Sequence, residues 1–508
     1  MGNPKGFLEI KRQASGYRPV KERLKDFAEL EKRLSTEERI LQASRCMDCG
    51  VPFCNWACPL GNVMPQWQNL IYQGRWKEAI SILHATNNLP EITGRVCPAL
   101  CEASCVLSID DEAVTIRENE LAAIEYAFEN GYIKPQLPPF RTGKKVAVIG
   151  SGPAGLACAD QLNKMGHSVV IFEKDAKAGG LLRYGIPDFK LDKNIIDRRL
   201  NIYRKEGIEI QTNTIVGQDI SADYLKKSFD AVCLTTGAGQ PRDLAVNGRD
   251  LQGVHFAMEY LTPQNTDNEL KAESSKLKDH ASPPQILRSA AQNDVPANQP
   301  PTTNHQPLST EISAKNKHVL IIGGGDTGSD CVGTANRQGA KSVTQIEILP
   351  QPPEARTEDM PWPVWPTLYK SSSSHQEGCE RMWGVATKEL LGKDGIVKTA
   401  SLSKVEWSSP DSSVQRQMSK VSGSDFELKA DLVLLAMGFV HPVHEGLLDD
   451  LNIEYDQRGN VQNNNYKTNI PGVFTAGDTT RGASLVVWAI LSGREAAVAI
   501  NIFFEGRT

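Results

Sequence analysis

Short apolar runs that end in glycine-rich turns dominate the pattern of hydrophobic and polar positions along the chain. Residues 145–149 form such a run, which leads into Gly150-Ser151-Gly152-Pro153-Ala154-Gly155 and then into a helical pattern that reaches about Lys164. A continuous apolar run of this length is typical of a strand buried on both faces of a parallel sheet. Residues 318–322 lead in the same way into Gly323-Gly324-Gly325-Asp326-Thr327-Gly328. The pattern therefore predicts two strand–turn–helix units of the α/β class.

The two units resemble each other beyond their turns. A cysteine follows the first glycine by eight positions in both units, as Cys158 and as Cys331. Residues 231–237, with the sequence AVCLTTG, also resemble residues 431–438, with the sequence DLVLLAMG. We therefore expect two related, Rossmann-like dinucleotide-binding domains.

The remaining segments have other patterns. Residues 21–33 and 36–44 are charged and suggest helices, and the Pro-rich residues 134–139 suggest a linker, so we expect a helical domain over residues 1–140. Residues 264–316 are rich in Pro, Asn, Gln, Ser and Thr and have no sustained apolar period. Such a segment buries too little surface to offset its ordering entropy, so we expect a mostly disordered insertion with at most a short helix at 285–291.

Composition narrows the class of partner and the compartment. The net charge of -5, from 56 basic and 61 acidic residues, gives no reason to expect nucleic acid or an anionic membrane as a partner. No apolar stretch approaches the roughly 18 residues of a spanning helix, and residues 1–6 lack the apolar core of a signal peptide. We therefore expect a cytoplasmic protein that does not enter the membrane.

Seven of the eleven cysteines form a compact cluster with the spacing C-x2-C-x4-C-x3-C followed by C-x3-C-x3-C. These seven are Cys46, Cys49, Cys54, Cys58, Cys97, Cys101 and Cys105. Structural zinc sites usually close with four ligands in two pairs, whereas four thiols followed by three suit a two-cluster ferredoxin-like arrangement. Disulfides are disfavoured in a reducing cytosol. We therefore expect two 4Fe-4S clusters, for which seven cysteines leave one of eight ligand positions open.

The order of the cysteines predicts a crossover between the clusters. Pro59 follows Cys58 and Pro98 follows Cys97, as in the cysteine–proline pairs of bacterial ferredoxins. In that pattern the fourth cysteine of a run binds the other cluster. We therefore expect Cys58 to join the later cysteines.

The first glycine loop has the context of an adenine-dinucleotide site. Gly150 permits the turn, Gly152 lets a pyrophosphate approach the backbone, and Gly155 lets helix and strand pack. Glu173 ends the next apolar run, 23 positions after Gly150, where a carboxylate accepts hydrogen bonds from ribose hydroxyls.

A motif near the C-terminus indicates which dinucleotide binds at the first glycine loop. Residues 475–478, with the sequence TAGD, resemble the motif by which flavin-disulfide-reductase-like proteins hold FAD, with Asp478 in the binding role. Asp478 could instead cap a helix that follows at about residues 485–503. We expect a discontinuous FAD domain over 141–250 and 430–508, and a coenzyme domain over 251–429. The candidate FAD contacts are Gly150, Gly152, Pro153, Ala154, Gly155, Glu173, Gly180, Gly237, Gly477 and Asp478.

The second glycine loop is expected to hold a nicotinamide coenzyme through Gly323, Gly325, Asp326, Thr327 and Gly328. The residues leave its identity open. Glu347 on the following strand could favour the free ribose of NADH, whereas Arg356 could meet the 2′-phosphate of NADPH. Arg337 and Arg381 are weaker candidates for that phosphate.

Together, residues 6–9 with the sequence GFLE, the seven cysteines and the two glycine loops resemble the small subunit of glutamate synthase over nearly the whole chain. The N-terminal part is also similar to that of dihydropyrimidine dehydrogenase. The resemblance implies one cluster on Cys46, Cys49, Cys54 and Cys105. It implies a second cluster on Cys58, Cys97, Cys101 and a non-cysteine residue, which falls at Glu120, with Glu118 as the near alternative.

The resemblance also implies an activity. The chain would oxidise NADPH, with NADH possible, through FAD and pass electrons through the clusters to a large subunit. That subunit would carry FMN and an iron–sulfur centre and would make glutamate from glutamine and 2-oxoglutarate. Two rivals are the corresponding subunit of a dihydropyrimidine dehydrogenase or ferredoxin:NADP oxidoreductase, and a zinc-bearing assembly module without enzymatic activity.

Overall fold

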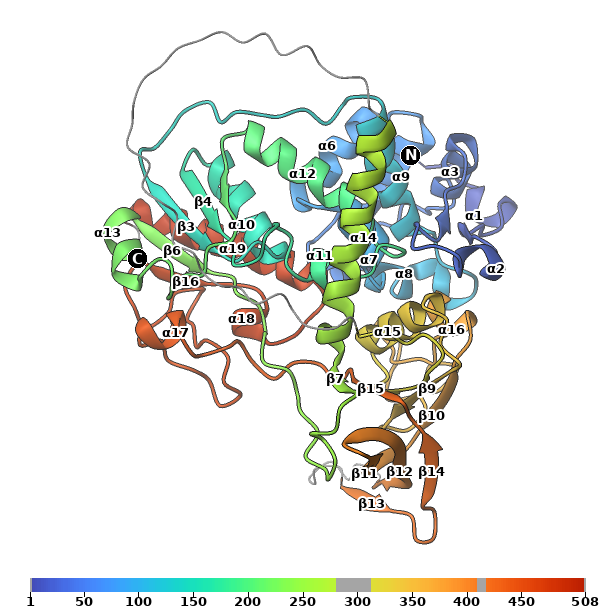
Figure 1. The fold of residues 1–508 in the computed structure, drawn as a ribbon. Coiled ribbons are helices and arrows are strands. Elements are labelled where there is room, and N and C mark those ends of the chain that lie inside the picture. Colours follow the sequence, from blue (N-terminus) through green and yellow to red (C-terminus); the bar gives the residue numbers. More distant parts are fainter. Residues whose placement is uncertain (1, 280–311, 409–416, 507–508) are drawn as a thin grey trace.

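The computed structural model describes residues 2–279, 312–408 and 417–506, which form three parts (Figure 1). A helical N-terminal domain packs beside an α/β domain, and a second α/β domain with an added antiparallel sheet lies below them in this view. The predicted fold class, a helical domain followed by two Rossmann-like domains, is confirmed.

The N-terminal domain is built from short helices around its own apolar core. Its helices are α1 (Gly6–Glu9), α2 (Val20–Arg23), α3 (Thr36–Ala43), α4 (Phe53–Ala57), α5 (Met64–Tyr72), α6 (Trp76–Thr86), α7 (Pro90–Val96), α8 (Leu100–Ala103), α9 (Ile116–Glu129) and the 3-10 helix Val106–Ile109. The start of α3 is encoded locally, because the Ser35 hydroxyl accepts from the Glu38 amide while the Glu38 carboxylate accepts from the Ser35 amide. The helix predicted at 36–44 is confirmed.

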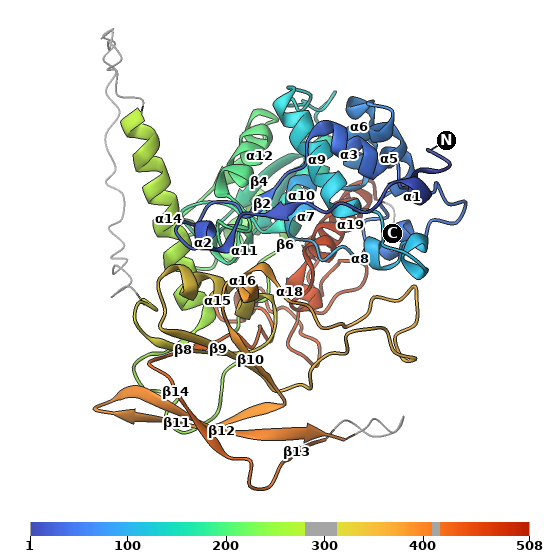
Figure 2. The same ribbon diagram turned by 90° about the vertical axis from the view of Figure 1, so that its right-hand side faces the viewer.

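The helix predicted at 21–33 is wrong over most of its length. Residues 16–32, which we call the strap, contain only strand β1 (Gly16–Tyr17), α2 and strand β2 (Glu31–Lys32). The strap crosses toward the two α/β domains (Figure 2), where Arg23 forms a buried ion pair with Glu377 at 2.8 Å and the Leu30 amide donates to the Phe189 carbonyl at 3.1 Å. These distant partners override the local helical preference.

The first α/β domain has a five-stranded parallel sheet in the order β16-β6-β3-β4-β5. The strands are β3 (Lys145–Ile149), β4 (Ser168–Phe172), β5 (Glu209–Gln211), β6 (Ala231–Leu234) and β16 (Val473–Thr475). The helices are α10 (Pro153–Lys164), α11 (Leu181–Tyr184), α12 (Lys193–Lys205), α13 (Ala222–Ser228), α17 (Leu447–Asp450), α18 (Asp478–Arg481) and α19 (Val486–Phe504). Alternate residues of β3 enter two different apolar cores, because helices cover both faces of the sheet.

The second α/β domain repeats this plan with the strand order β10-β9-β8-β15-β7. The strands are β7 (Val254–Phe256), β8 (His318–Ile322), β9 (Ser342–Glu347), β10 (Glu380–Trp383) and β15 (Leu432–Leu435), and the helices are α14 (Ala257–Asp279), α15 (Asp326–Arg337) and α16 (Ser373–Gln376). Strand β15 lies beside β8 as β6 lies beside β3, which explains the resemblance of residues 431–438 to residues 231–237. The domain boundary predicted at residue 430 is therefore too early, since the chain returns to the first domain only after β15.

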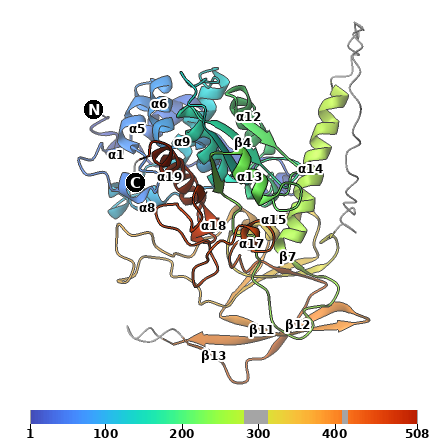
Figure 3. The ribbon, with the colours of Figure 1, turned by 90° about the vertical axis from the view of Figure 1, so that its left-hand side faces the viewer.

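An antiparallel sheet of β11 (Val385–Lys393), β12 (Ile396–Trp407), β13 (Met418–Lys420) and β14 (Phe426–Lys429) extends the second domain at its outer end (Figure 3). No pattern in the sequence predicted this sheet. It connects β10 to β15, so it is an insertion between two strands of the parallel sheet. Its side chains share an apolar core with that sheet.

The insertion predicted at 264–316 has ordered ends. Helix α14 continues to Asp279, and Glu269 on it forms ion pairs with Arg183 and, at 2.8 Å, with Lys177 of the first α/β domain. At the other end Ala314 is buried and its amide donates to the Gln338 side chain at 2.8 Å. Residues 280–311, which include the short helix predicted at 285–291, lie outside the described residues.

Helix α19 alone, in the described part of the chain, is long and apolar enough to cross a membrane by length and composition. It is packed in the core of the first α/β domain. Gly493 lies so close to α10 that a Cβ there would stand 2.1 Å from the Ala154 carbonyl oxygen. Its apolar character therefore has an explanation within the fold.

Candidate functional site

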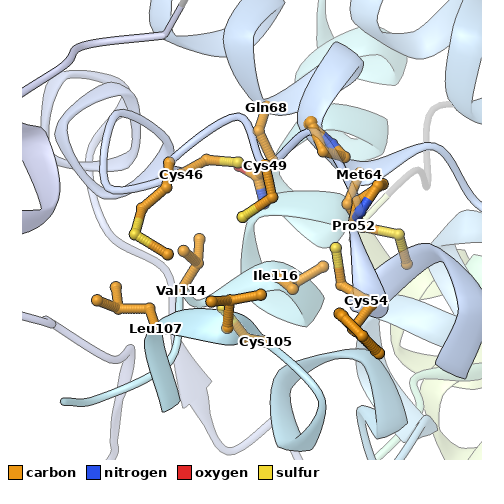
Figure 4. A pocket seen from close by; sticks show the side chains of 14 residues that line it. Cys46, Cys49, Pro52, Cys54, Met64, Gln68, Cys105, Leu107, Val114 and Ile116 are labelled. Carbon is orange, nitrogen blue, oxygen red and sulfur yellow. The ribbon is translucent and has the colours of Figure 1, made fainter. Parts of the chain in front are cut away.

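Four of the clustered cysteines, Cys46, Cys49, Cys54 and Cys105, line one cavity in the N-terminal domain (Figure 4). We call them the first thiol group. The cavity lies between the loop before α4, α4 itself and the 3-10 helix, and the other lining residues are mostly apolar. Within the described residues, no three His, Cys, Asp or Glu side chains converge as the ligands of a single metal ion would. Thiols that surround a cavity fit a cluster, because each thiolate binds a different iron.

The other three cysteines, Cys58, Cys97 and Cys101, form a second thiol group beside Glu120. Burial raises the pKa of Cys97 to about 12, and the negative charges of Glu120 and Cys58 act in the same direction. Burial also raises the pKa of Cys101, and Cys58, Cys97 and Glu120 contribute to that shift. Cys58 thus lies with the later cysteines, although it belongs to the earlier run.

Each thiol group has a residue in the left-handed backbone conformation beside it. Asp48, between Cys46 and Cys49, has a φ of 53°, and Ala99, two residues after Cys97, has a φ of 65°. Non-glycine residues rarely adopt such values, so the surrounding structure must hold them there. At the second site the Ala99 amide also donates to the Cys97 sulfur at 3.4 Å.

Burial, together with neighbouring negative charges, disfavours the thiolate form of Cys46, Cys54 and Cys58. It raises the pKa of Cys46 and Cys54 to about 12 and that of Cys58 to about 11. A thiol with such a pKa ionises only when a nearby cation compensates for the lost hydration. The residues therefore fit iron, whose charge would stabilise the thiolates.

Glu120 and Glu118 both lie on α9 but have different surroundings. Glu120 accepts hydrogen bonds from Asn87 Nδ2 at 3.1 Å and from Thr93 Oγ1, and burial raises its pKa to about 7. Glu118 instead forms a buried ion pair with Arg39 at 3.2 Å. Of these two glutamates, only Glu120 contributes its negative charge to the raised pKa values of Cys58, Cys97 and Cys101.

The first glycine loop leaves room where a pyrophosphate would lie. A Cβ on Gly152 would meet no atom within 4 Å, whereas one on Gly155 would stand 2.0 Å from the Gly150 carbonyl oxygen. Gly152 therefore borders open space and Gly155 marks a close packing contact. The Glu173 carboxylate accepts from the Ser151 amide at 3.0 Å, which places it at the loop.

The remaining candidates for FAD binding surround this loop. Helix α10 begins at Pro153, and Gly180 lies so close that a Cβ there would stand 3.0 Å from the Gly152 Cα. A Cβ on Gly477 would stand 2.6 Å from the Ala154 Cβ. The Gly237 amide, at the end of β6, donates to Thr479 Oγ1 in α18 at 2.9 Å. Segments from both halves of the discontinuous domain thus meet at one site.

Asp478 begins α18 rather than capping the last helix. Its buried carboxylate accepts from Ser484 Oγ at 2.6 Å, and burial raises its pKa. Helix α19 begins after Leu485, which provides no side-chain hydrogen bond to its first amides. These amides are therefore available to an electron-rich ring, with the positive end of the helix dipole behind them.

The second glycine loop has the same geometry. A Cβ on Gly325 would meet nothing within 4 Å, and one on Gly328 would stand 2.3 Å from the Gly323 carbonyl oxygen. Asp326 and Thr327 are the first residues of α15. Both loops therefore fit a dinucleotide.

Two of the candidate arginines are already engaged. Arg337 is buried and forms an ion pair with Glu377. The guanidinium of Arg356 donates to three backbone carbonyls, those of Met360, Val364 and Ala103. For Arg356 to meet a 2′-phosphate, as the sequence allowed, it would have to give up these bonds.

The residues that position the candidate sites could not be recognised in the sequence. Asn87 and Thr93 donate hydrogen bonds to Glu120 and are separated from it by 33 and 27 positions in the sequence. Thr479 accepts from the Gly237 amide across 242 positions. No local pattern marks such residues, because their role arises only when distant segments meet.

Comparisons with known families agree with this division of the chain. A family model described as dihydropyrimidine dehydrogenase domain II, 4Fe-4S cluster, matches residues 23–132. A second, described as pyridine nucleotide-disulphide oxidoreductase, matches residues 144–493, which is more than half of the chain. The chain thus belongs to that oxidoreductase family and carries an iron–sulfur domain before it.

Solved structures share the fold of the α/β part. FprA from Mycobacterium tuberculosis, in a structure titled as its complex with NADPH, is 16% identical with a TM-score of 0.53. The match covers 72% of this chain and 86% of that one. At this identity the likeness concerns the fold alone.

Curated relatives match the whole chain. A protein named glutamate synthase [NADPH] small chain from Mycobacterium tuberculosis is 47% identical, over 100% of this chain and 97% of that protein. A small chain of the same name from Bacillus subtilis is 43% identical, over 100% and 99%. The protein named glutamate synthase [NADH] from Schizosaccharomyces pombe is 43% identical over 99% of this chain, which corresponds to 23% of that longer protein. The predicted resemblance is confirmed, and the chain belongs to the glutamate synthase small chains.

Proposed function

We propose that the chain is the electron-input subunit of a glutamate synthase. One observation carries this proposal. The chain matches the small chains over its whole length and contains both the two glycine loops that fit a dinucleotide and the two buried thiol groups. When bound, FAD would take a hydride from a reduced nicotinamide coenzyme and release electrons singly to the iron–sulfur clusters. The protein would supply position and electrostatics.

Each part of the chain has a role in this scheme. The loop at Gly152 would hold the FAD pyrophosphate, with Glu173 near the ribose, and Asp478 and the start of α19 would face the flavin end. The loop at Gly325 would hold the coenzyme. These roles rest on the open space at Gly152 and Gly325 and on the uncapped amides of α19.

The ligand sets follow the two thiol groups. The first cluster would bind Cys46, Cys49, Cys54 and Cys105, and the second would bind Cys58, Cys97, Cys101 and Glu120. Glu120 is preferred to Glu118 because Glu118 is neutralised by Arg39, whereas Glu120 lies beside three thiols. A carboxylate is a harder ligand than a thiolate, so the second cluster should differ in reduction potential from the first.

The electron acceptor would be a large chain that completes the enzyme. In the Schizosaccharomyces pombe and Saccharomyces cerevisiae proteins named glutamate synthase [NADH], the part that matches this chain is 23% and 22% of the polypeptide. In those relatives, the remaining part is covalently attached. Here it would be a separate subunit, and the buried thiols suit a cytoplasmic, reducing compartment.

The test is to change Glu120→Ala in the complete chain, prepared anaerobically, and to measure iron, sulfide, flavin and electron paramagnetic resonance signals. We expect one cluster to be lost or altered, while FAD content and flavin reduction by the coenzyme are retained and transfer to the large subunit falls. Glu129→Ala, at an exposed position of the same helix, is the matched control and should change none of these.

Two results would count against the proposal. Two intact clusters with unaltered signals in Glu120→Ala would return Glu120 to a purely structural role. A wild-type preparation that contains zinc and no flavin would instead favour the assembly module and remove the proposed activity altogether.

A further inference from the structure

A buried glutamine lines the cavity that the first thiol group surrounds (Figure 4). Gln68 lies on α5, and its side chain is fully buried. Within the described residues, the other side chains that line this cavity are the four cysteines and apolar groups. Gln68 is therefore the one polar side chain, apart from the thiols, that this part of the structure brings to the cavity.

A chain of hydrogen bonds fixes the orientation of the Gln68 amide. Arg39 Nη1 donates to Asn119 Oδ1 at 3.1 Å, and a guanidinium can only donate. The Thr115 hydroxyl donates to the same oxygen at 3.2 Å. The other end of the Asn119 amide, Nδ2, donates to Gln68 Oε1 at 2.8 Å. The oxygen of Gln68 therefore faces Asn119, and its NH2 group is at the opposite end.

That NH2 group is left without a partner. Gln68 Nε2 is buried and has no hydrogen-bond partner among the described residues. A buried donor in this state is costly, because it has lost its hydrogen bonds to water and gained none. Turning the amide over would not help, since it would set two NH2 groups against each other. Nε2 is therefore a free donor on a side chain that borders the four thiols.

A cluster in this cavity would supply the missing acceptor. The thiolate and sulfide sulfurs of an iron–sulfur cluster carry negative charge and accept hydrogen bonds, and such bonds help to set its reduction potential. A donor favours the reduced cluster, which carries one more electron. The buried Arg39 cation polarises both amides in the same sense, and the low dielectric of the interior strengthens such a chain.

We propose that Gln68 Nε2 donates a hydrogen bond to a sulfur of the cluster in the first thiol group and raises the reduction potential of that cluster. The proposal rests on the cluster that the proposed function assigns to these cysteines, and it adds the side chain that tunes it. By stabilising the reduced state, Gln68 favours the transfer of electrons to the first cluster.

The test is an anaerobic redox titration of the complete, cofactor-loaded chain, followed by electron paramagnetic resonance. The signal of the first cluster is the one that remains in Glu120→Ala. Gln68→Met keeps the length of the side chain and removes the donor. We expect the equilibrium constant for one-electron reduction of the first cluster to fall about tenfold, which is a shift of about 59 mV to a more negative midpoint. The second cluster should keep its midpoint.

A second variant keeps the contact with Asn119. In Gln68→Glu a carboxylate oxygen can still accept from Asn119 Nδ2, but the ionised group cannot donate to the cluster. When it is protonated, its hydroxyl can donate again. The first-cluster midpoint of this variant should therefore lie below that of the wild type at high pH and rise toward it as the pH falls. Gln73→Met, at the exposed position that directly follows α5, is the matched control and should change neither midpoint.

The outcomes separate this inference from the proposed function. Equal first-cluster midpoints in the wild type and in both Gln68 variants would overturn the tuning role while the electron-input function stands. Loss of the first cluster from both variants would also overturn it, because Gln68 would then support the ligand loops instead. If the wild type itself contains no iron–sulfur cluster, the proposed function fails.

Discussion

Glu91 and Arg199 form a buried, two-pronged ion pair between the helical domain and the first α/β domain. Glu91 lies on α7 and Arg199 on α12, with Nε–Oε1 and Nη2–Oε2 distances of 2.6 and 2.8 Å. Both side chains are almost fully buried. Water cannot replace either partner at this buried position. The pair should therefore keep the helical domain, with the proposed cluster sites, at a fixed distance and orientation to the domain with the proposed flavin site.

The Glu91–Arg199 pair gives a first prediction. Glu91→Gln leaves the Arg199 charge buried without a counter-ion, so we expect the free energy of unfolding to fall by about 3–5 kcal/mol. Urea denaturation followed by flavin and tryptophan fluorescence measures this. Glu78→Gln, which breaks the exposed pair with Arg75, is the control and should change stability little. Equal stability of both variants would show that the buried pair does not hold the domains.

A second prediction separates the two glycine loops. Gly152 and Gly325 have φ values of −66° and −79°, which valine also adopts, and a Cβ at either position meets no protein atom within 4 Å. Valine should therefore leave the fold intact and clash only with a pyrophosphate. We expect Gly152→Val to lose FAD, and Gly325→Val to keep FAD but lose coenzyme binding, as measured by flavin absorbance and coenzyme titration. Loss of flavin from Gly325→Val would reverse the assignment of the loops.

A third prediction concerns the dependence of stability on pH. Burial lowers the pKa of His375 from its usual 6.5 to about 4, and its ring contacts Gln345, whose amide holds the Gly323 carbonyl. Because the folded pKa is lowered, the unfolded chain binds more protons between these values. The stabilising contribution is thus complete above about pH 6.5 and is lost as the pH falls toward about 4. Urea midpoints of the wild type and of His375→Gln over this range measure it, and a slope that persists unchanged in the variant would assign it to other groups.

A fourth prediction concerns the segment between α14 and β8. Replacing residues 280–311 with a short Gly/Ser linker should leave FAD content and coenzyme oxidation nearly unchanged, because the closure cost of a loop depends weakly on its length. A longer deletion that removes residues 264–311 is the control. It removes Glu269 and its ion pairs with Lys177 and Arg183, so it should lower stability. Loss of FAD in the shorter deletion would show that this segment supports the flavin site.

Features that depend on neighbouring residues could be predicted from the sequence. The apolar run of residues 145–149 and the glycines after it form a strand, turn and helix as expected, because a buried parallel strand and a tight turn each impose a local pattern. The capped helix α3 is a similar case. The helix predicted at 21–33 failed where local preference and tertiary contacts disagree: Arg23 is an ordinary helix former, but its buried ion pair with Glu377 joins residues 354 positions apart.

The sequence by itself determined the two dinucleotide-binding units, the clustering of seven cysteines and the family. Glycine turns, cysteine spacing and apolar runs are local patterns, and few structures or ligands are compatible with them. Only the tertiary structure decided that β15 completes the second sheet, that Glu118 pairs with Arg39 whereas the charge of Glu120 acts on Cys97, and that Arg356 is engaged elsewhere. Each of these depends on segments far apart in the chain, and their contacts are set by the packing of whole domains. A carboxylate or guanidinium acquires its role from the charges and donors that surround it after folding, which its neighbours in sequence do not specify.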